Sequence, residues 1–150
     1  MTTAFDTDVL ICAATPGHPL GRRVAVSFDV VPREIVGIGS ALLLPEVLAK
    51  PMRQDPESSE VAWLTGLLGR LELRPVDAAT SRLALDFAVK YGLQAADAVH
   101  LATAVLARAD RFLTNNRRDF PRTISEIDIV YPEDLPDPGD PQVEVGSSEG

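Results

Sequence analysis

A chain of 150 residues with 45% hydrophobic residues is long enough to form one globular domain with its own core. The net charge of −8 at pH 7 argues against a protein that coats nucleic acid through a basic surface, but not against an enzyme that acts on nucleic acid through metal ions. The single cysteine, Cys12, excludes an internal disulfide. We expect it to be a small buried residue on a helix. No apolar stretch is long enough to span a bilayer and the N-terminus does not resemble a signal peptide, so we expect a cytoplasmic protein with no membrane association.

The acidic residues are concentrated at the C-terminal end. Residues 132–150 contain six acidic residues and no Lys or Arg, and removing these six charges from the net charge of −8 leaves −2 for the rest of the chain. The same segment contains four prolines and ends in Gly-Ser-Ser-Glu-Gly. Such a composition buries too little apolar surface to fold. We therefore predict a domain over residues 1–131 and a disordered, acidic, proline-rich tail over residues 132–150.

Apolar residues recur with strand and helix periods in alternation along the domain. The predicted strands run over 3–5, 35–38, 71–76, 112–114 and 127–131. The predicted helices run over 9–14, 20–28, 41–49, 59–71, 78–91 and 97–109. Alternation of this kind predicts an α/β fold, with a parallel sheet covered by helices on both faces.

Single residues refine these boundaries. Ser40 is a candidate N-cap for the third helix, and Pro45 is expected to kink or restart that helix. Asp77 and Gly92 have the residue types that favour the two ends of the fifth helix. We expect Trp63 to be packed in the interior, because most tryptophans are largely buried.

Acidic and amide side chains follow the predicted strands at the points where the strands end. Asp6 and Asp8 follow the first strand, Glu46 lies in the apolar run after the second, and Asp97 begins the alanine-rich sixth helix. The fourth strand leads into the polar segment 115–119. In open α/β sheets, ligands bind at the carboxyl ends of the strands. We therefore expect these side chains to converge.

Glu46 and Asp97 carry the argument for a metal ion. Each is the only acid in a long apolar run that contains no nearby Lys or Arg, and a buried carboxylate is costly unless it is paired or bound to a metal. Carboxylates gathered at one sheet edge suit Mg²⁺ or Mn²⁺, which activates water and stabilises charge on a phosphodiester. Simpler interpretations stay open, because Asp97 could be a helix cap, Glu46 a surface residue and Asp6 a turn former. His100, one turn after Asp97, is more often a packed or hydrogen-bonded residue than a ligand.

Four segments together resemble the PIN-domain ribonucleases. Residues 5–11 read FDTDVLI, 40–48 read SALLLPEVL, 93–102 read LQAADAVHLA and 112–120 read FLTNNRRDF. These segments and the element order cover nearly all of residues 3–131, and the single short domain most resembles the VapC-like toxins of bacterial toxin–antitoxin pairs. The resemblance implies a three-layer α/β/α sandwich with a central parallel sheet of four or five strands. It also implies Mg²⁺- or Mn²⁺-dependent cleavage of single-stranded RNA, a homodimer and a small antitoxin partner.

The resemblance assigns roles to particular residues. Asp6, Glu46 and Asp97 correspond to the first, second and third metal-binding acids. Where the family commonly has a fourth acid, this chain has Asn116, which can offer a carbonyl oxygen as a metal ligand but adds no charge. Asp119, about one turn further on, is the candidate substitute and completes the predicted catalytic set.

Other residues near these motifs have supporting roles. Thr114 is a candidate to orient a carboxylate or a water molecule, and Asp8 stands where Asn or Ser is usual, so it could return the missing charge. Arg117, Arg118 and Arg122 are candidates for contacts with RNA phosphates.

Two other functions remain open from the sequence. The segment around Asp6 and Asp8 also resembles the opening of haloacid-dehalogenase-type phosphatases, but Leu10 stands where that family has Thr, and a later Lys and paired acids are not evident. The amide at Asn116 leaves open a catalytically weak PIN-like scaffold that binds RNA or protein.

Overall fold

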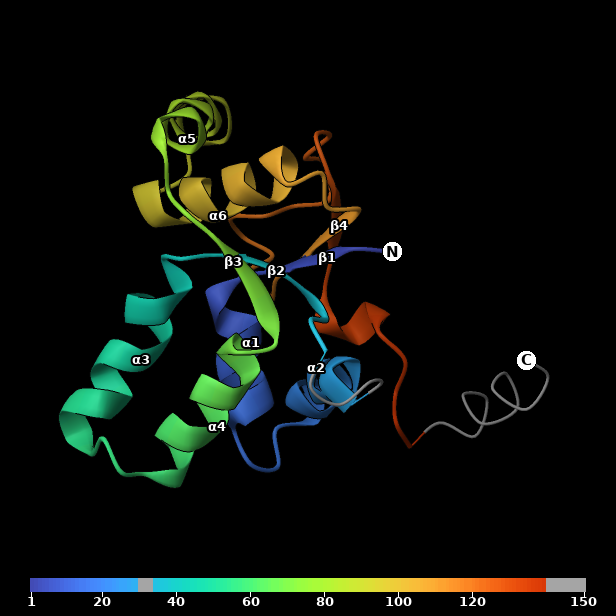
Figure 1. Cartoon of the computed structure of the whole chain (residues 1–150). Coiled ribbons are helices and arrows are strands. Elements are labelled where there is room, and N and C mark those ends of the chain that lie inside the picture. Colours follow the sequence, from blue (N-terminus) through green and yellow to red (C-terminus); the bar gives the residue numbers. More distant parts are fainter. Residues whose placement is uncertain (30–33, 140–150) are drawn as a thin grey trace.

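The computed structural model describes residues 1–29 and 34–139 (Figure 1). The strands are β1 (Thr3–Phe5), β2 (Gly37–Ser40), β3 (Leu71–Arg74), β4 (Arg111–Leu113) and β5 (Asp128–Val130). The helices are α1 (Thr7–Ala14), α2 (Pro19–Asp29), α3 (Leu43–Gln54), α4 (Ser59–Leu68), α5 (Ala78–Tyr91), α6 (Ala95–Leu106) and the 3₁₀ helix η1 (Pro132–Asp134).

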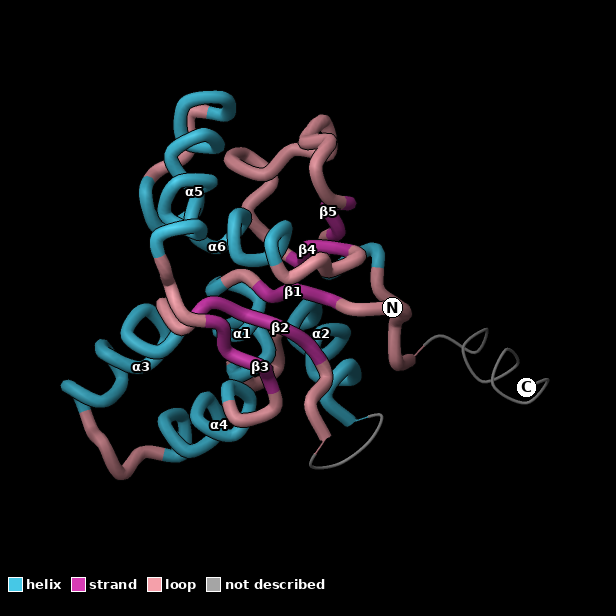
Figure 2. Tube along the Cα trace, turned by 45° about the horizontal axis from the view of Figure 1, so that its top comes forward, coloured by secondary structure: helices cyan, strands magenta, loops and turns pink. Residues whose placement is uncertain are grey.

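The five strands form one parallel sheet in the order β3-β2-β1-β4-β5. Ala4 in the central strand β1 pairs with Ile38 of β2 on one side and with Phe112 of β4 on the other. Helices α1 to α4 cover one face of the sheet, and α5 and α6 cover the other (Figures 1 and 2). This confirms the predicted α/β/α sandwich and its upper count of five strands.

Side chains alternate between two cores, as the strand period of two requires. Phe5 and Leu113 point into the core beneath α1 to α4, whereas their neighbours Ala4 and Phe112 point into the core beneath α5 and α6. All four residues are buried. Because the strands are parallel, their carboxyl ends lie along the same edge of the sheet, and the loops after β1, β2 and β4 start there.

The predicted ends of α5 are confirmed. The Asp77 carboxylate accepts a hydrogen bond from the backbone N–H of Thr80 at 2.9 Å. Gly92 ends the helix in the left-handed conformation at φ +67°, which glycine adopts without strain. The structure also places β3 at an edge of the sheet.

The predicted start and end of the third helix are wrong. Ser40 belongs to β2, where it pairs with Arg74, so α3 begins only at Leu43. Pro45 causes no kink, because it lies in the first turn, where a helix has no internal acceptor for a backbone N–H. The helix also runs through Pro51 to Gln54, beyond the predicted end at residue 49.

Two side chains are more exposed than expected. Trp63 is 57% exposed, because α4 turns its other apolar residues, among them Leu64 and Leu68, toward the core. Cys12 lies on α1 as predicted but is only partly buried.

The start of the predicted tail packs against the domain. Pro132 lies in η1 and is buried, and Leu135 is buried in the core beneath α1 to α4. Arg23 of α2 donates to the backbone carbonyls of Glu133 and Leu135. Packing therefore extends past residue 131, and the part of the predicted tail over residues 140–150 lies outside the described residues.

Among the described residues, no helix is both long and apolar enough to span a membrane.

Candidate active site

Asp6 is fixed at the carboxyl end of β1 by contacts from two elements. It is the N-cap of α1, and its carboxylate accepts a hydrogen bond from the backbone N–H of Thr7 at 2.8 Å. Its other oxygen accepts from the hydroxyl of Thr114, just after β4, at 2.7 Å. Asp6 is 4% exposed, so its carboxylate is held in one orientation at a nearly dry position.

The polar turn after β4 is held by its own side chains. The amide nitrogen of Asn116 donates to the Asp119 carboxylate at 2.9 Å, and the carbonyl oxygen of Asn116 accepts from the backbone N–H of Asp119 at 3.2 Å. The backbone N–H of Asn116 donates to the Thr114 hydroxyl, and that of Asn115 donates to the Asp8 carboxylate at 3.1 Å. Asn116 and Asp119 thus form one unit, and the turn contacts Asp6 through Thr114 and Asp8 through Asn115.

Glu46 is held by two residues that adjoin the other predicted metal-binding acids. Its oxygen Oε1 accepts from the hydroxyl of Thr7 at 2.9 Å and contacts Nε2 of His100. Thr7 follows Asp6 directly, and His100 lies one turn after Asp97. The side chain of Glu46 is 31% exposed, so this acid lies at the rim rather than in the interior.

His100 is 2% exposed and its contacts define its tautomer. Because the Glu46 carboxylate can only accept, Nε2 of His100 carries a proton. Within residues 1–29 and 34–139, no hydrogen-bond partner faces Nδ1. The predicted hydrogen-bonded role of His100 is therefore observed, and its partner is the second acid of the site.

Asp97 lies in the first turn of α6 and is partly buried. Burial raises its pKa above the usual value, and the negative charge of Asp119 raises it further. His100 lowers the pKa, and Glu46 adds the smallest increase. Asp97 in turn contributes to a raised pKa of Asp8, where burial is again the largest cause. The carboxylates at the start of α1, on α3, on α6 and in the turn after β4 therefore interact electrostatically, each with at least one other.

Among these acids, Asp6 has the pKa with the largest increase. Burial raises its pKa from 3.8 to about 7, and the charge of Asp8 adds to the increase. The nearby His100 and the hydrogen bonds from Thr114 and Thr7 oppose the increase without cancelling it. Keeping Asp6 ionised is costly unless a positive charge is present.

Comparison with known families decides between the candidate classes. The family model of the PIN domain matches residues 4–125. The chain belongs to the PIN-domain family. This decides against the phosphatase alternative, whose resemblance was confined to the segment around Asp6 and Asp8.

Solved structures agree with the fold of this PIN domain. A toxin–antitoxin complex from Klebsiella pneumoniae contains a chain with a TM-score of 0.66 and 22% identity, and the match covers 88% of this chain and 98% of that one. The structure of VapBC2 from Rickettsia felis, bound to a DNA fragment from its promoter, contains a chain with a TM-score of 0.65 and 15% identity, covering 87% and 98%. A comparison with curated proteins gave no match.

The donor set of this PIN domain suits a hard divalent cation. Asp6, Asp8, Asp97 and Asp119 offer only oxygen ligands, and in the described part of the chain none of them forms an ion pair with Lys or Arg. The described residues include no group of three His, Cys, Asp or Glu side chains already placed around one point to hold an ion. The acids thus fit Mg²⁺ or Mn²⁺ by chemistry and charge.

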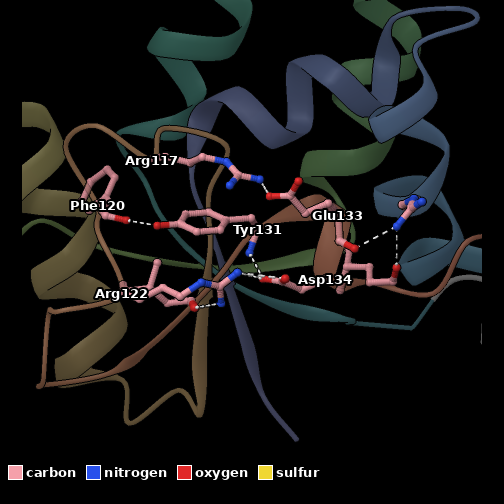
Figure 3. Close-up of polar contacts among 9 residues, drawn as sticks. Arg117, Phe120, Arg122, Tyr131, Glu133 and Asp134 are labelled. Atoms are coloured by element: carbon pink, nitrogen blue, oxygen red, sulfur yellow. Dashed lines mark hydrogen bonds and ion pairs between the residues drawn. The ribbon is translucent and has the colours of Figure 1, made fainter.

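The three arginines predicted to contact RNA have different surroundings. Arg117 pairs with Glu133 and Arg122 pairs with Asp134, and both guanidinium groups lie against the ring of Tyr131 (Figure 3). Arg118 is exposed, and the described residues provide it with no ion pair. The sequence indicated the arginines but not their acidic partners, which were assigned to a disordered tail.

Two further contacts of the PIN-domain site were not predicted. Thr7 and His100 both bind Glu46, which ties the second acid to the elements that carry the first and third. The available signal was their sequence position, because Thr7 follows Asp6 and His100 lies three residues after Asp97. Such spacing places a residue near the site but does not say which acid it contacts.

Proposed function

We propose that this PIN domain is a metal-dependent endoribonuclease that cleaves single-stranded RNA, and that it is the toxin of a bacterial toxin–antitoxin pair. The observation that carries the proposal is a series of interacting acids at the carboxyl edge of the sheet. Asp6 interacts with Asp8, Asp8 with Asp97, and Asp97 with Asp119 and Glu46. Burial is the largest cause of the raised pKa of Asp6 and of Asp97, and neighbouring acids add to both increases. In the described part of the chain no Lys or Arg forms an ion pair with either carboxylate. Such a gathering is stabilised when a divalent cation binds.

In this mechanism the acids would bind the metal ion, and neighbouring residues would hold the acids in place. Asp6, Glu46 and Asp97 would hold Mg²⁺ or Mn²⁺, with Asn116 and Asp119 at the fourth position. The bound cation would supply an activated water and stabilise charge on the phosphodiester. Thr7 and Thr114 keep the Asp6 carboxylate in one orientation, and the Asn116–Asp119 pair limits the motion of the turn beside it.

The partners follow from the same proposal. The sequence motifs resemble those of VapC-like toxins. One similar solved structure is a toxin–antitoxin complex, and the other is VapBC2 bound to a DNA fragment. We infer that this chain pairs with a small antitoxin, forms a homodimer and acts in the cytoplasm on RNA.

The direct test of activity is cleavage of a panel of single-stranded RNAs by the full chain. We expect endonucleolytic products in Mg²⁺ or Mn²⁺, and none when EDTA is present. Equal cleavage with and without the chelator would rule out the metal-dependent mechanism.

His100 gives a second prediction, because it holds Glu46. His100→Leu should weaken Mn²⁺ binding and slow cleavage by about 10- to 100-fold, as is usual when the partner of a metal ligand is lost. His100→Gln, which keeps an N–H donor, should recover part of both. Calorimetry with Mn²⁺ and cleavage rates measure the effect, and thermal melting reports whether either variant is misfolded. If His100→Leu binds Mn²⁺ as wild type does, then Glu46 is not positioned by His100.

A second candidate function has two observations in its favour. Asn116 replaces the commonly acidic fourth position, and no three ligating side chains among the described residues are already grouped around an ion. A PIN-like scaffold would therefore bind RNA or protein without cutting it. Binding of RNA with no cleavage in Mg²⁺ or Mn²⁺, across the whole panel, would favour the scaffold.

A further inference from the structure

The ring of Tyr131 lies between two arginines beside the candidate active site. The guanidinium carbon of Arg117 lies 4.6 Å from the ring centre, and that of Arg122 lies 4.5 Å from it. Figure 3 shows Arg117 above the ring and Arg122 below it. The hydroxyl of Tyr131 donates to the carbonyl of Phe120 at 2.8 Å, and the residue is 4% exposed. The ring is thus a fixed support that holds two cationic groups in place.

Both cationic groups are bound by carboxylates of the adjoining C-terminal segment. The guanidinium of Arg122 donates to both oxygens of Asp134, at 2.9 and 2.7 Å, and Arg117 pairs with Glu133. Both hydrogen bonds come from one nitrogen, Nη2 of Arg122, and arginine uses the same N–H donors to bind phosphate oxygens. Glu133 and Asp134 therefore satisfy the same donors that a nucleic-acid backbone would use.

The arginines and the acidic site share one loop. Arg117 immediately follows Asn116 and lies within the turn closed by the Asn116–Asp119 hydrogen bonds. That turn starts at Thr114, which binds Asp6. An RNA strand with its scissile phosphate at Asp6 would therefore pass close to Arg117, and Arg122 lies against the same Tyr131 ring as Arg117.

We propose that Glu133 and Asp134 occupy an RNA-phosphate site formed by Arg117, Tyr131 and Arg122, so that RNA must displace these two carboxylates to bind productively. This inference rests on the proposed function in taking RNA as the ligand. It assigns an autoinhibitory role to the acidic segment that follows β5.

The exposure of the two ion pairs makes displacement feasible. The side chains of Arg117 and Glu133 are 53% and 44% exposed, and those of Arg122 and Asp134 are 55% and 32% exposed. Ion pairs this exposed contribute little to stability and are screened by salt. A polyanion that offers several phosphates can therefore compete with them.

The backbone of the segment has an anchor that does not depend on these carboxylates. Arg23 of α2 donates to the carbonyl oxygens of Glu133 at 2.8 Å and Leu135 at 3.2 Å. Leu135 is buried in the core. Neutralising the two acids should therefore release the arginines without releasing the segment.

The test compares RNA binding by wild type with binding by the double variant Glu133→Gln/Asp134→Asn. Fluorescence anisotropy of a labelled single-stranded oligouridylate in EDTA measures binding without cleavage. We expect the double variant to bind about tenfold more tightly. We also expect the slope of log affinity against log salt to steepen by about 1.4, because two more phosphates are contacted at about 0.7 each.

The matched control removes the same charge elsewhere. Glu57→Gln/Asp86→Asn changes two exposed acids, on the loop before α4 and on α5, and should alter affinity less than threefold with an unchanged salt slope. Because the Asp134 carboxylate also accepts from the backbone N–H of Tyr131, the single variant Glu133→Gln provides a second test if the double variant melts early. It should give part of the increase in affinity.

The outcomes separate this inference from the proposed function. If the affinity and salt slope of both neutralised variants match the control, or if no variant binds RNA, the autoinhibitory role is wrong. If wild type cleaves RNA in Mg²⁺ while the affinities are unchanged, only this inference fails. If the double variant binds more tightly and nothing is cleaved in Mg²⁺ or Mn²⁺, the inference stands and the nuclease function fails.

Discussion

Asp6→Asn is expected to stabilise the metal-free protein at pH 8 and, in the same molecule, to abolish RNA cleavage. The Asp6 carboxylate is buried and its pKa is raised to about 7, so at pH 8 the folded protein holds a charge that its surroundings disfavour. The amide has no charge to desolvate. It can still accept from the backbone N–H of Thr7 and donate to the hydroxyl of Thr114, whose oxygen can accept a second hydrogen bond.

The sign of the pH dependence follows from the two pKa values of Asp6. Between pH 3.8 and about pH 7, the folded protein keeps a proton that the unfolded chain has released. The contribution of Asp6 to stability therefore falls as pH rises through this window. Each pKa unit corresponds to about 1.4 kcal/mol, so the loss approaches about 4 kcal/mol at pH 8. Wild type should lose stability over this range in EDTA, and Asp6→Asn should lose less.

Thermal melting in EDTA at pH 5 and pH 8 measures the stabilisation by Asp6→Asn and its dependence on pH. We expect the melting temperature of Asp6→Asn to exceed that of wild type by about 8 to 16 °C at pH 8, and by less than half of this at pH 5. Asp86→Asn, which changes an exposed acid on α5, is the matched control and should melt as wild type does. If Asp6→Asn melts at or below the wild-type temperature at pH 8, the charge of the buried Asp6 carboxylate does not destabilise the metal-free protein.

Asp97→Asn should reduce RNA cleavage in Mg²⁺ by about a thousandfold. The Asp97 carboxylate interacts electrostatically with both Glu46 and Asp119. Its replacement by an amide removes one negative charge that would bind the metal ion between these acids. Metal-assisted stabilisation of a phosphodiester transition state is worth several kcal/mol, and each 1.4 kcal/mol is a factor of ten in rate. Because Asp97 is only partly buried, we expect a smaller gain in stability than for Asp6→Asn.

The measurement is the initial rate of cleavage at saturating Mg²⁺, with Asp86→Asn as control. Asp86→Asn should retain the full rate, since Asp86 is exposed on α5. If the rate of Asp97→Asn stays within about tenfold of wild type, Asp97 does not bind the catalytic metal.

The architecture was largely predictable because it depends on patterns that extend over many residues. Alternating strand and helix periods fix a parallel sheet, and a parallel sheet places the ends of β1, β2 and β4 at one edge. The acids that follow those strands were therefore expected to converge. The ends of α5 were predictable for a local reason, since Asp77 accepts a hydrogen bond within the first turn and Gly92 adopts the left-handed conformation that ends the helix.

The predictions from the sequence are wrong where contacts between distant parts of the chain determine the structure. Ser40 has the residue type of a helix cap, but pairing with β3 draws it into the sheet. Trp63 has the residue type of a core residue, but its position on α4 turns it outward. The segment that begins at Pro132 lacks the apolar content to fold alone. It is held by Arg23, Arg122 and the burial of Leu135, none of which a local pattern specifies.

The same limit applies within the site. Glu46 and Asp97 are candidates from the sequence because each is the only acid in an apolar run, and Asp6 is a candidate because its segment matches a PIN-domain motif. Their role as metal ligands stays a prediction. The orientation of Glu46 could not be predicted, because it depends on Thr7 and His100, which are 39 and 54 residues away in the sequence. Likewise, the pairing of Asn116 with Asp119 depends on the exact geometry of the turn.

Calorimetric titration of Mn²⁺ into the chelator-stripped full chain tests most directly whether Asp6, Glu46 and Asp97 form a metal site. We expect saturable binding at sub-millimolar Mn²⁺ for wild type and Asp86→Asn, and strongly weakened binding for Asp6→Asn and Asp97→Asn. Absence of binding at millimolar Mn²⁺, or equal binding by all four proteins, would contradict a metal centre at these acids.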